Sequence, residues 1–188
     1  MTPTMTRRLQ SFLLLAALAG CGGATQYRHP KADLGAIKTV GVLPFVTMTG
    51  EPGVAERVQA VFTIELLAAN AFDVVEPGRM LKTLRDAHAG TSGELTPDEL
   101  KKLGKELGVQ GLFMGTVIEF GESHETVTTP QVTIQLKLIE TGSGVTVWAA
   151  TETQGGAGLG QRLFGVGGQT PIEAARAVVR TLIGKLVD

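Results

Sequence analysis

The chain has 188 residues, of which 43% are hydrophobic and 5% aromatic, and its formal net charge is −1. This length and apolar share exclude wholesale disorder and predict one domain of ordinary size, with a core of Val, Leu, Ile and Ala. The net charge is close to neutral and the sequence has no stripe of basic residues, which argues against a nucleic-acid partner.

Residues 1–20 have the layout of an export signal. Arg7 and Arg8 precede an apolar run at residues 12–19. A membrane-spanning helix needs about 20 apolar residues, so this run is too short to span, but it suits the apolar region of a secretory signal peptide. We therefore predict that residues 1–20 are absent from the mature protein.

The apolar run ends in Leu18-Ala19-Gly20-Cys21, which contains the only cysteine of the chain. This sequence resembles the lipobox of bacterial lipoproteins, in which the cysteine takes a diacylglyceryl group and the new amino terminus is acylated, for example with palmitate. The resemblance implies that acylated Cys21 anchors the protein in membrane lipid. Because Gly22 rather than Asp follows, it also implies the periplasmic face of the cell outer membrane.

The alternative reading of this segment is ordinary signal cleavage after the small-x-small sequence at residues 17–19. That cut would release a soluble protein with one unpaired thiol, which is unusual in a secreted chain. The position of Cys21 therefore favours lipidation.

The next segment, residues 21–35, is polar, contains glycine and proline and shows no periodicity, so it predicts a flexible tether. Residues 36–188 form the predicted domain. The predicted strands are residues 37–46, 72–76, 109–120, 131–140 and 145–153, and the predicted helices are residues 54–70, 77–87, 96–108 and 170–187.

Periodicity and capping residues support these elements. Helix 54–70 has one apolar face, and strand 131–140 alternates so that Val132, Ile134, Leu136 and Leu138 share a side. Thr96 with Glu99, and Thr170 with Glu173, have the spacing of capping boxes. Trp148 lies in a predicted strand and is expected in the core.

The element order β-α-β-α-α-β-β-β-α predicts a single-domain α/β fold. The strand–helix alternation of the first half implies parallel pairing through crossovers, and strands 131–140 and 145–153 imply an antiparallel hairpin. We expect one mixed sheet with helices packed on it.

Four segments, at residues 40–45 (VGVLPF), 72–76 (FDVVE), 103–117 and 139–149, carry a family resemblance. In this order they resemble the curli-secretion (CsgG-like) lipoprotein family. The lipoprotein activators of penicillin-binding proteins and the amino-terminal domain of the Tol-system translocation protein are similar. The resemblance spans residues 36–188 and implies a periplasmic α/β domain that acts through protein contacts.

The resemblance implies that the protein is an accessory in envelope assembly or secretion, or a scaffold. Its implied partners are envelope proteins, and one implied form is a homo-oligomer. The alternatives are a subunit of an oligomeric curli-type secretion channel and an activator of a peptidoglycan synthase. The channel type inserts extra β-hairpins at positions matching residues 121–130 and 154–169 here. The first segment is too short and carries three acidic or histidine side chains, and the second is rich in glycine.

The glycine-rich segment 155–168 fits no complete phosphate-binding pattern. Its apolar residues Leu163, Phe164 and Val166 predict a contact with a partner subunit or the membrane surface. The segment therefore predicts a contact site.

The remaining candidates for chemistry lack the partners that catalysis or metal binding would need. His29, His88 and His124 have no metal-site spacing, and His124-Glu125 lacks the second histidine of a zinc-protease motif. With Cys21 lipidated there is no free thiol, and no G-x-S-x-G elbow occurs. We expect a protein that is not an enzyme and holds no cofactor and no metal.

Overall fold

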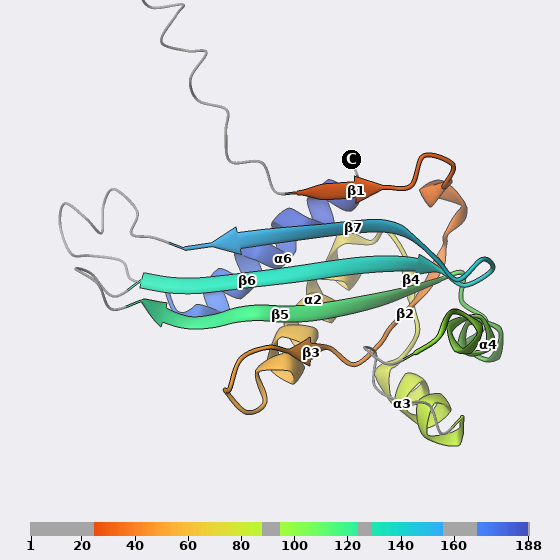
Figure 1. Ribbon diagram of the computed structural model, residues 1–188, viewed down its shortest axis with the longest axis horizontal. Helices are drawn as coiled ribbons and strands as arrows, with labels where there is room; N and C mark the ends of the chain where they lie inside the picture. Colours follow the sequence, from red (N-terminus) through yellow and green to blue (C-terminus); the bar gives the residue numbers. More distant parts are fainter. Residues whose placement is uncertain (1–24, 88–94, 124–128, 156–168, 188) are drawn as a thin grey trace, which may run out of the picture.

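The computed structural model describes residues 25–87, 95–123, 129–155 and 169–187. Within them a mixed sheet is covered by α2 and α6 on one face, with α3 and α4 beside one end of the long strands (Figure 1). The elements in chain order are β1 (Gln26–Arg28), the 3₁₀ turn η2 (Leu34–Ala36), β2 (Thr39–Val42), β3 (Val46–Thr47), α2 (Val54–Ala69), β4 (Asp73–Val74), α3 (Pro77–Asp86), α4 (Pro97–Leu107), β5 (Gly111–Ser123), β6 (Thr129–Glu140), β7 (Val145–Gln154) and α6 (Pro171–Val187).

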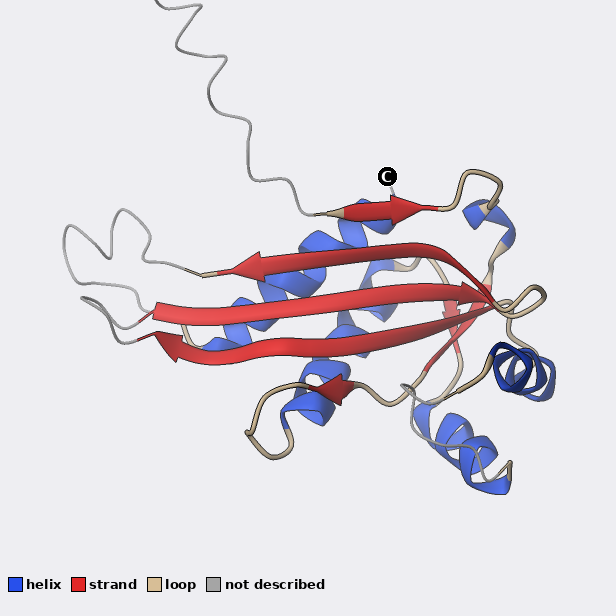
Figure 2. Ribbon diagram, viewed as in Figure 1, coloured by secondary structure: helices blue, strands red, loops and turns tan. Residues whose placement is uncertain are grey.

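The strand order of the sheet is β1-β7-β6-β5-β2-β4, and the short β3 also pairs with β5. β2 runs parallel to both β4 and β5, whereas β5, β6, β7 and β1 are antiparallel neighbours. Figure 2 shows the three long strands side by side as the centre of the molecule. The predicted fold class, a single mixed sheet with packed helices, is confirmed.

The main core lies between the sheet and the helix pair α2 and α6. The four alternating residues of β6 from Val132 to Leu138 are all buried there, as their spacing predicts, and so is Trp148. Phe62 of α2 packs edge-on against Phe113 of β5, with ring centroids 5.2 Å apart. This packing fixes which side of α2 faces the sheet.

A second, smaller core fills the opposite face of the sheet at one end. Here α3 and α4 bury Met80, Leu103 and Leu107 against Leu112 of β5. The rest of that sheet face is not covered by a helix in the part of the chain that the structure describes (Figure 2). Helices on one face of β5–β6–β7 and solvent on the other explain why β6 alternates apolar and polar residues.

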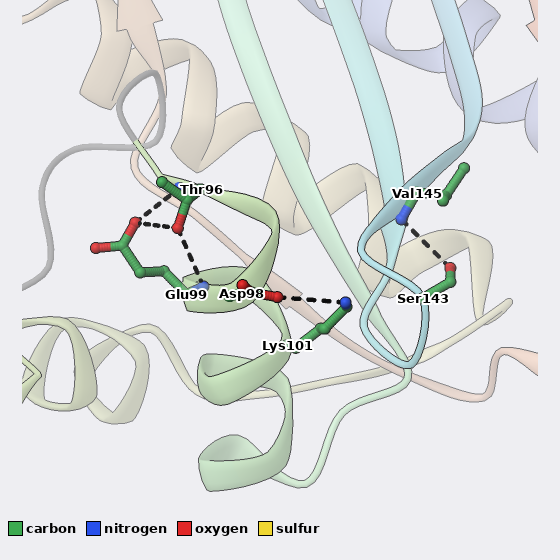
Figure 3. Close-up of polar contacts among 6 residues, drawn as sticks. All are labelled: Thr96, Asp98, Glu99, Lys101, Ser143 and Val145. Carbon is green, nitrogen blue, oxygen red and sulfur yellow. Dashed lines mark hydrogen bonds and ion pairs between the residues drawn. The ribbon is translucent and has the colours of Figure 1, made fainter.

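The start of α4 has the capping box that its sequence predicts (Figure 3). The backbone N–H of Thr96 donates to Glu99 Oε2 at 2.7 Å, and the N–H of Glu99 donates to Thr96 Oγ1 at 3.3 Å. The helix ends at Gly108, whose φ of 69° is the left-handed conformation that favours glycine. Both ends of α4 are therefore set by local sequence.

The structure describes residues 25–35 of the segment predicted as a flexible tether, and the first of these residues form a strand. Residues 26–28 form β1, which pairs with residues 148–150 of β7, and the N–H of Thr151 donates to the Thr25 carbonyl at 3.1 Å. The Arg28 side chain also donates to the Leu186 carbonyl. Backbone pairing at a sheet edge needs no apolar periodicity, so a polar sequence can form such a strand. Residues 25–28 therefore belong to the sheet, although the predicted domain starts at residue 36.

The predicted strand 37–46 is divided into β2 and β3. Pro44 lies between them, and because proline has no backbone N–H it interrupts a strand ladder. The other predicted strands and helices occur at their expected places, with ends that differ by a few residues.

Among the described residues no helix is both long and apolar enough to cross a membrane.

Candidate functional site

Helix α2 is apolar on two sides. Its sheet-facing side buries Val54, Ala55, Val58, Phe62 and Leu66. Between Gln59 and Ala69 the sequence contains one charged residue, Glu65. A surface helix of a soluble domain ordinarily has a polar side opposite its buried one, so α2 departs from that pattern.

The outward side of α2 carries a second apolar stripe, made of Ala60, Ile64, Leu67 and Ala68. Their spacing of four, three and one residues places them on one helical face. Ile64 is 64% exposed and Leu67 is 50% exposed. Large aliphatic side chains grouped on one exposed face are typical of a contact surface.

A groove of about 310 Å³ lies next to this stripe, between α2 and α6. Ala68 and Ala69 line it from α2, and Ile183, Gly184 and Val187 line it from α6. Figure 1 shows the two helices side by side on the same face of the sheet. We call the stripe and groove together the α2–α6 face.

Charged residues at the groove are paired with one another. Glu65 accepts a hydrogen bond from Arg180 Nε at 2.8 Å and lies 3.4 Å from Arg176 Nε. The hydrogen bond to Glu65, and then the carboxylate's charge, raise the pKa of the Arg180 guanidinium above its ordinary value. The α2–α6 face therefore combines apolar side chains with a cluster of two arginines and one glutamate, whose formal net charge is +1.

A second hollow, of about 410 Å³, lies between the carboxyl-terminal half of α4 and the β6–β7 turn. Lys101 and Lys105 lie on its rim, and Lys101 pairs with Asp98 at 3.4 Å (Figure 3). The Thr141 hydroxyl lines it but donates to the Val109 carbonyl at 2.7 Å. Because this hollow lies at the carboxyl end of a helix, where the helix dipole is negative, it is a poor anion site despite its lysines.

The site residues predicted from sequence, Cys21, Leu163, Phe164 and Val166, lie outside the described residues. Their roles stay predictions. His88 and His124 lie outside as well. The ring Nδ1 of His29 accepts a hydrogen bond from the Lys31 backbone N–H at 3.2 Å. Among the described residues no group of three His, Cys, Asp or Glu is placed to hold a metal ion.

Sequence reasoning missed the α2–α6 face. It predicted a single apolar face for helix 54–70. The available signal was the second set of apolar positions at Ala60, Ile64, Leu67 and Ala68. That spacing indicates two apolar faces on one helix, but it does not say which of them the sheet covers.

No family model and no curated protein matches the chain. The family resemblance seen in the sequence therefore stays a prediction.

Solved structures share the fold. A variant PelC dodecamer from Paraburkholderia phytofirmans aligns with a TM-score of 0.61 and 17% identity, over 88% of this chain and 98% of that chain. Lipoprotein GNA1162 from Neisseria meningitidis aligns with a TM-score of 0.55 and 14% identity, over 80% of this chain and 98% of that chain. The hypothetical protein CT253 from Chlamydia trachomatis aligns with a TM-score of 0.53 and 8% identity, over 80% of this chain and 96% of that chain. The structures that share this fold thus include a lipoprotein and a dodecamer.

Proposed function

We propose that the protein is a lipid-anchored lipoprotein of the bacterial cell envelope that works by binding proteins and not by catalysis. Its role is that of an assembly or secretion accessory, or a scaffold, at the periplasmic face of the outer membrane. The observation that carries this proposal is the α2–α6 face, an exposed apolar surface on an otherwise ordinary α/β domain. Such a surface is expected where another protein packs.

The anchoring part of the proposal rests on the export signal and on Cys21 after Leu18-Ala19-Gly20. The likeness of the fold to lipoprotein GNA1162 agrees with it. Gly22, in place of the Asp that retains enterobacterial lipoproteins at the inner membrane, supports the outer membrane as the location. Two or more acyl chains hold a protein stably on a bilayer, so the anchor needs no basic residues.

The assembly part of the proposal rests on exposed Ile64 and Leu67. PelC, which shares the fold, is a dodecamer, and this supports an oligomeric form for the present chain. The segment containing Leu163, Phe164 and Val166 is proposed as a second contact, with a partner subunit or with the membrane surface. Channel formation and activation of a peptidoglycan synthase remain specific forms of the same contact function.

Metabolic labelling with an alkynyl fatty acid tests the anchor. Wild-type protein should carry the label and stay with membranes after a high-salt wash, whereas Cys21→Ala should lose the label and leave the membranes. A Cys21→Ala protein that still resists the salt wash would contradict lipid anchoring.

A photo-reactive amino acid at position 64 tests the contact surface in intact cells. Position 81 is the matched control, because Leu81 is also an exposed aliphatic residue but lies on α3. We expect discrete crosslinked protein products from position 64 and none, or far fewer, from position 81. Equal yields from the two positions would contradict a contact role for the α2–α6 face.

A further inference from the structure

We infer that the α2–α6 face binds an amphipathic helix of a partner protein, whose apolar side packs on the face and whose carboxylate pairs with Arg176 and Arg180. The inference rests on the proposed function, because it gives the chemistry of the partner at the same contact surface. Three features of the face carry it: the charges along the groove, the apolar lining, and the helical backbone on both sides of the groove.

Helices α2 and α6 run in the same direction beside the groove. Glu65 contacts Arg176 and Arg180, and Ala69 and Val187, which come later in the two helices, line the same groove. The carboxyl ends of both helices therefore lie at one end of the groove, and the two arginines lie toward the other end. Because the carboxyl end of a helix carries partial negative charge, the two ends of the groove differ in charge.

The arginine end of the groove can take one more negative charge. Among the described residues Glu65 is the one carboxylate paired with Arg176 and Arg180, so the cluster has a formal net charge of +1. Both pairs are made by the Nε atoms, and each guanidinium has further N–H donors on its Nη atoms. Both arginine side chains are more than half exposed, so a carboxylate can reach them from outside. The partner's acid therefore belongs beside the arginines.

The rest of the face takes apolar side chains. Ile64 and Leu67 form a ridge, and Ala68, Gly184 and Val187 line the groove next to it. An added Cβ at Gly184 meets nothing within 4 Å, so a side chain of the partner can enter there. A groove of about 310 Å³ holds a few aliphatic side chains rather than the surface of a whole domain. The size of the face therefore favours a short segment.

A helix is the form of segment that suits this face. Except at its ends, each of α2 and α6 satisfies its own backbone N–H and C=O groups, so the face lacks the free backbone groups that an extended peptide pairs with at a sheet edge. A helical partner satisfies its own backbone and contributes only side chains. Arg176 and Val187 are 11 residues apart on α6, a rise of about 16 Å, so about three turns of partner helix cover the groove.

The far end of the groove favours a protein over anionic lipid, which also combines a negative group with apolar chains. Carbonyl groups in the last turn of a helix have no donor within that helix. An acyl chain lying over the ends of α2 and α6 would displace water from such carbonyls and supply no donor, which is costly. Side chains of a partner helix can donate hydrogen bonds there.

The first experiment selects the partner chemistry without assuming its sequence. The full chain is held in phosphatidylcholine nanodiscs and exposed to a phage library of helical peptides of about 14 residues, randomised on one face. Enriched peptides should carry aliphatic residues three and four apart, with Asp or Glu toward one end. Enriched peptides that lack an acid, or no enrichment over empty nanodiscs, would overturn the inference.

The second experiment ties the acid to the arginines. One enriched peptide is made in its acidic form and with the acid replaced by the matching amide, and both forms are titrated by fluorescence anisotropy. The acidic form should bind the wild-type chain about threefold to fivefold more tightly. This preference should vanish in Arg180→Gln and persist in Arg85→Gln, which removes an exposed arginine of α3. An equal preference in Arg180→Gln and wild type would overturn the inference.

Two substitutions test the apolar part of the face. Ile64→Asp places a charge on the ridge, and Gly184→Gln fills the groove. Each should weaken both forms of the peptide at least about tenfold, whereas Leu81→Asp, at an exposed aliphatic residue of α3, should not. Unchanged circular dichroism of Gly184→Gln excludes misfolding as the cause. Binding that neither substitution weakens would contradict the inference.

The remaining outcomes separate lipid binding and failure of the proposed function. Short-chain dihexanoyl-phosphatidylglycerol should leave the peptide bound, and displacement that Arg180→Gln abolishes would assign the face to anionic lipid instead. If the wild-type chain does not stay with nanodiscs, the anchor is wrong, and the same titrations in solution judge the helix. If position 64 crosslinks to proteins in cells but the selected peptides carry no acid, the contact surface stands and the acidic helix is wrong.

Discussion

Gly115 lies in the middle of β5, where the ring of Phe45 crosses the strand. A Cβ atom built at Gly115 would approach the ring carbons to 2.4 Å, which is closer than any carbon–carbon contact allows. Phe45 is itself buried and packs against Phe62, with ring centroids 5.5 Å apart. The absence of a side chain at Gly115 is therefore what lets Phe45 join the main core.

We predict that Gly115→Ala destabilises the protein by about 1–3 kcal/mol, the usual cost of forcing an extra carbon into a packed core. Gly121→Ala on the same strand is the control, because a Cβ there meets nothing within 4 Å. That control should change the free energy of unfolding by less than about 0.5 kcal/mol. Urea denaturation of both variants measures the difference, and equal stabilities would contradict the packing described for Phe45.

Sequence alone could not find this glycine contact or the exposed stripe. Phe45 and Gly115 are far apart along the chain, so their meeting depends on the parallel pairing of β3 with β5. Likewise Ile64 and Phe62 are both apolar residues of one helix, and only the position of the sheet makes one buried and the other exposed. Residue type predicts that a side chain favours burial, but not whether the fold provides it.

At the scale of elements, three helices begin with a carboxylate that caps backbone N–H groups. Glu76 accepts hydrogen bonds from the N–H groups of Gly78 and Arg79, which lower its pKa. The backbone N–H and then the hydroxyl of Thr96 lower the pKa of Glu99 in the same way, and Thr170 does so for Glu173. These bonds need the charged form of each carboxylate.

The capping carboxylates predict an acid-sensitive fold. Each has an ordinary pKa of 4.5 that folding lowers, so the unfolded chain binds more protons between the two values. Their stabilisation is present above pH 4.5 and is lost as the pH falls through the lowered pKa values. Thermal unfolding from pH 7 to pH 3 should show a falling midpoint below pH 4.5. Glu99→Gln should show a shallower fall, and an identical slope would contradict the role given to Glu99.

Elements with local signals were predictable from sequence, and elements without them were not. The capping boxes of α4 and α6 need only residues three apart, and the burial of alternate residues in β6 needs only a period of two. Strand β1 has no such signal, because backbone atoms at the edge of β7 create it. The same local reasoning predicted one strand at residues 37–46, because it overlooked that Pro44, which has no backbone N–H, interrupts the hydrogen-bond ladder.

For the whole molecule, the chain order of helices and strands was enough to predict the mixed sheet. Strand–helix alternation forces parallel crossovers, and the run of three strands forces antiparallel pairing. The candidate site was not predictable to the same degree, because it consists of side chains of both α2 and α6 that remain accessible once the two helices pack together on the sheet. A surface of this kind exists only once all its neighbours are in place.

The pairing of β1 with β7 limits how far the domain can lie from Cys21. Four residue steps separate Cys21 from Thr25, the first residue that the structure describes, and a fully extended chain covers at most about 14 Å in that distance. Because β1 runs antiparallel to β7, its start points toward the end of the sheet where β7 finishes (Figure 1). Under the proposed lipid anchor on Cys21, the opposite end, with α3 and α4, would lie farther from the bilayer.

We therefore predict that a fluorophore at Gln154→Cys, on the near end, is quenched strongly by headgroup-labelled lipid, and that one at Lys102→Cys on α4 is quenched weakly. Inserting a long glycine–serine segment after Gly23 should remove the difference. Equal quenching at the two positions without the insert would contradict a short connection between Cys21 and Thr25. If Cys21 carries the proposed lipid anchor, the domain cannot reach from its own membrane across the periplasm to a distant layer. It can meet only what moves along, or protrudes from, its own membrane.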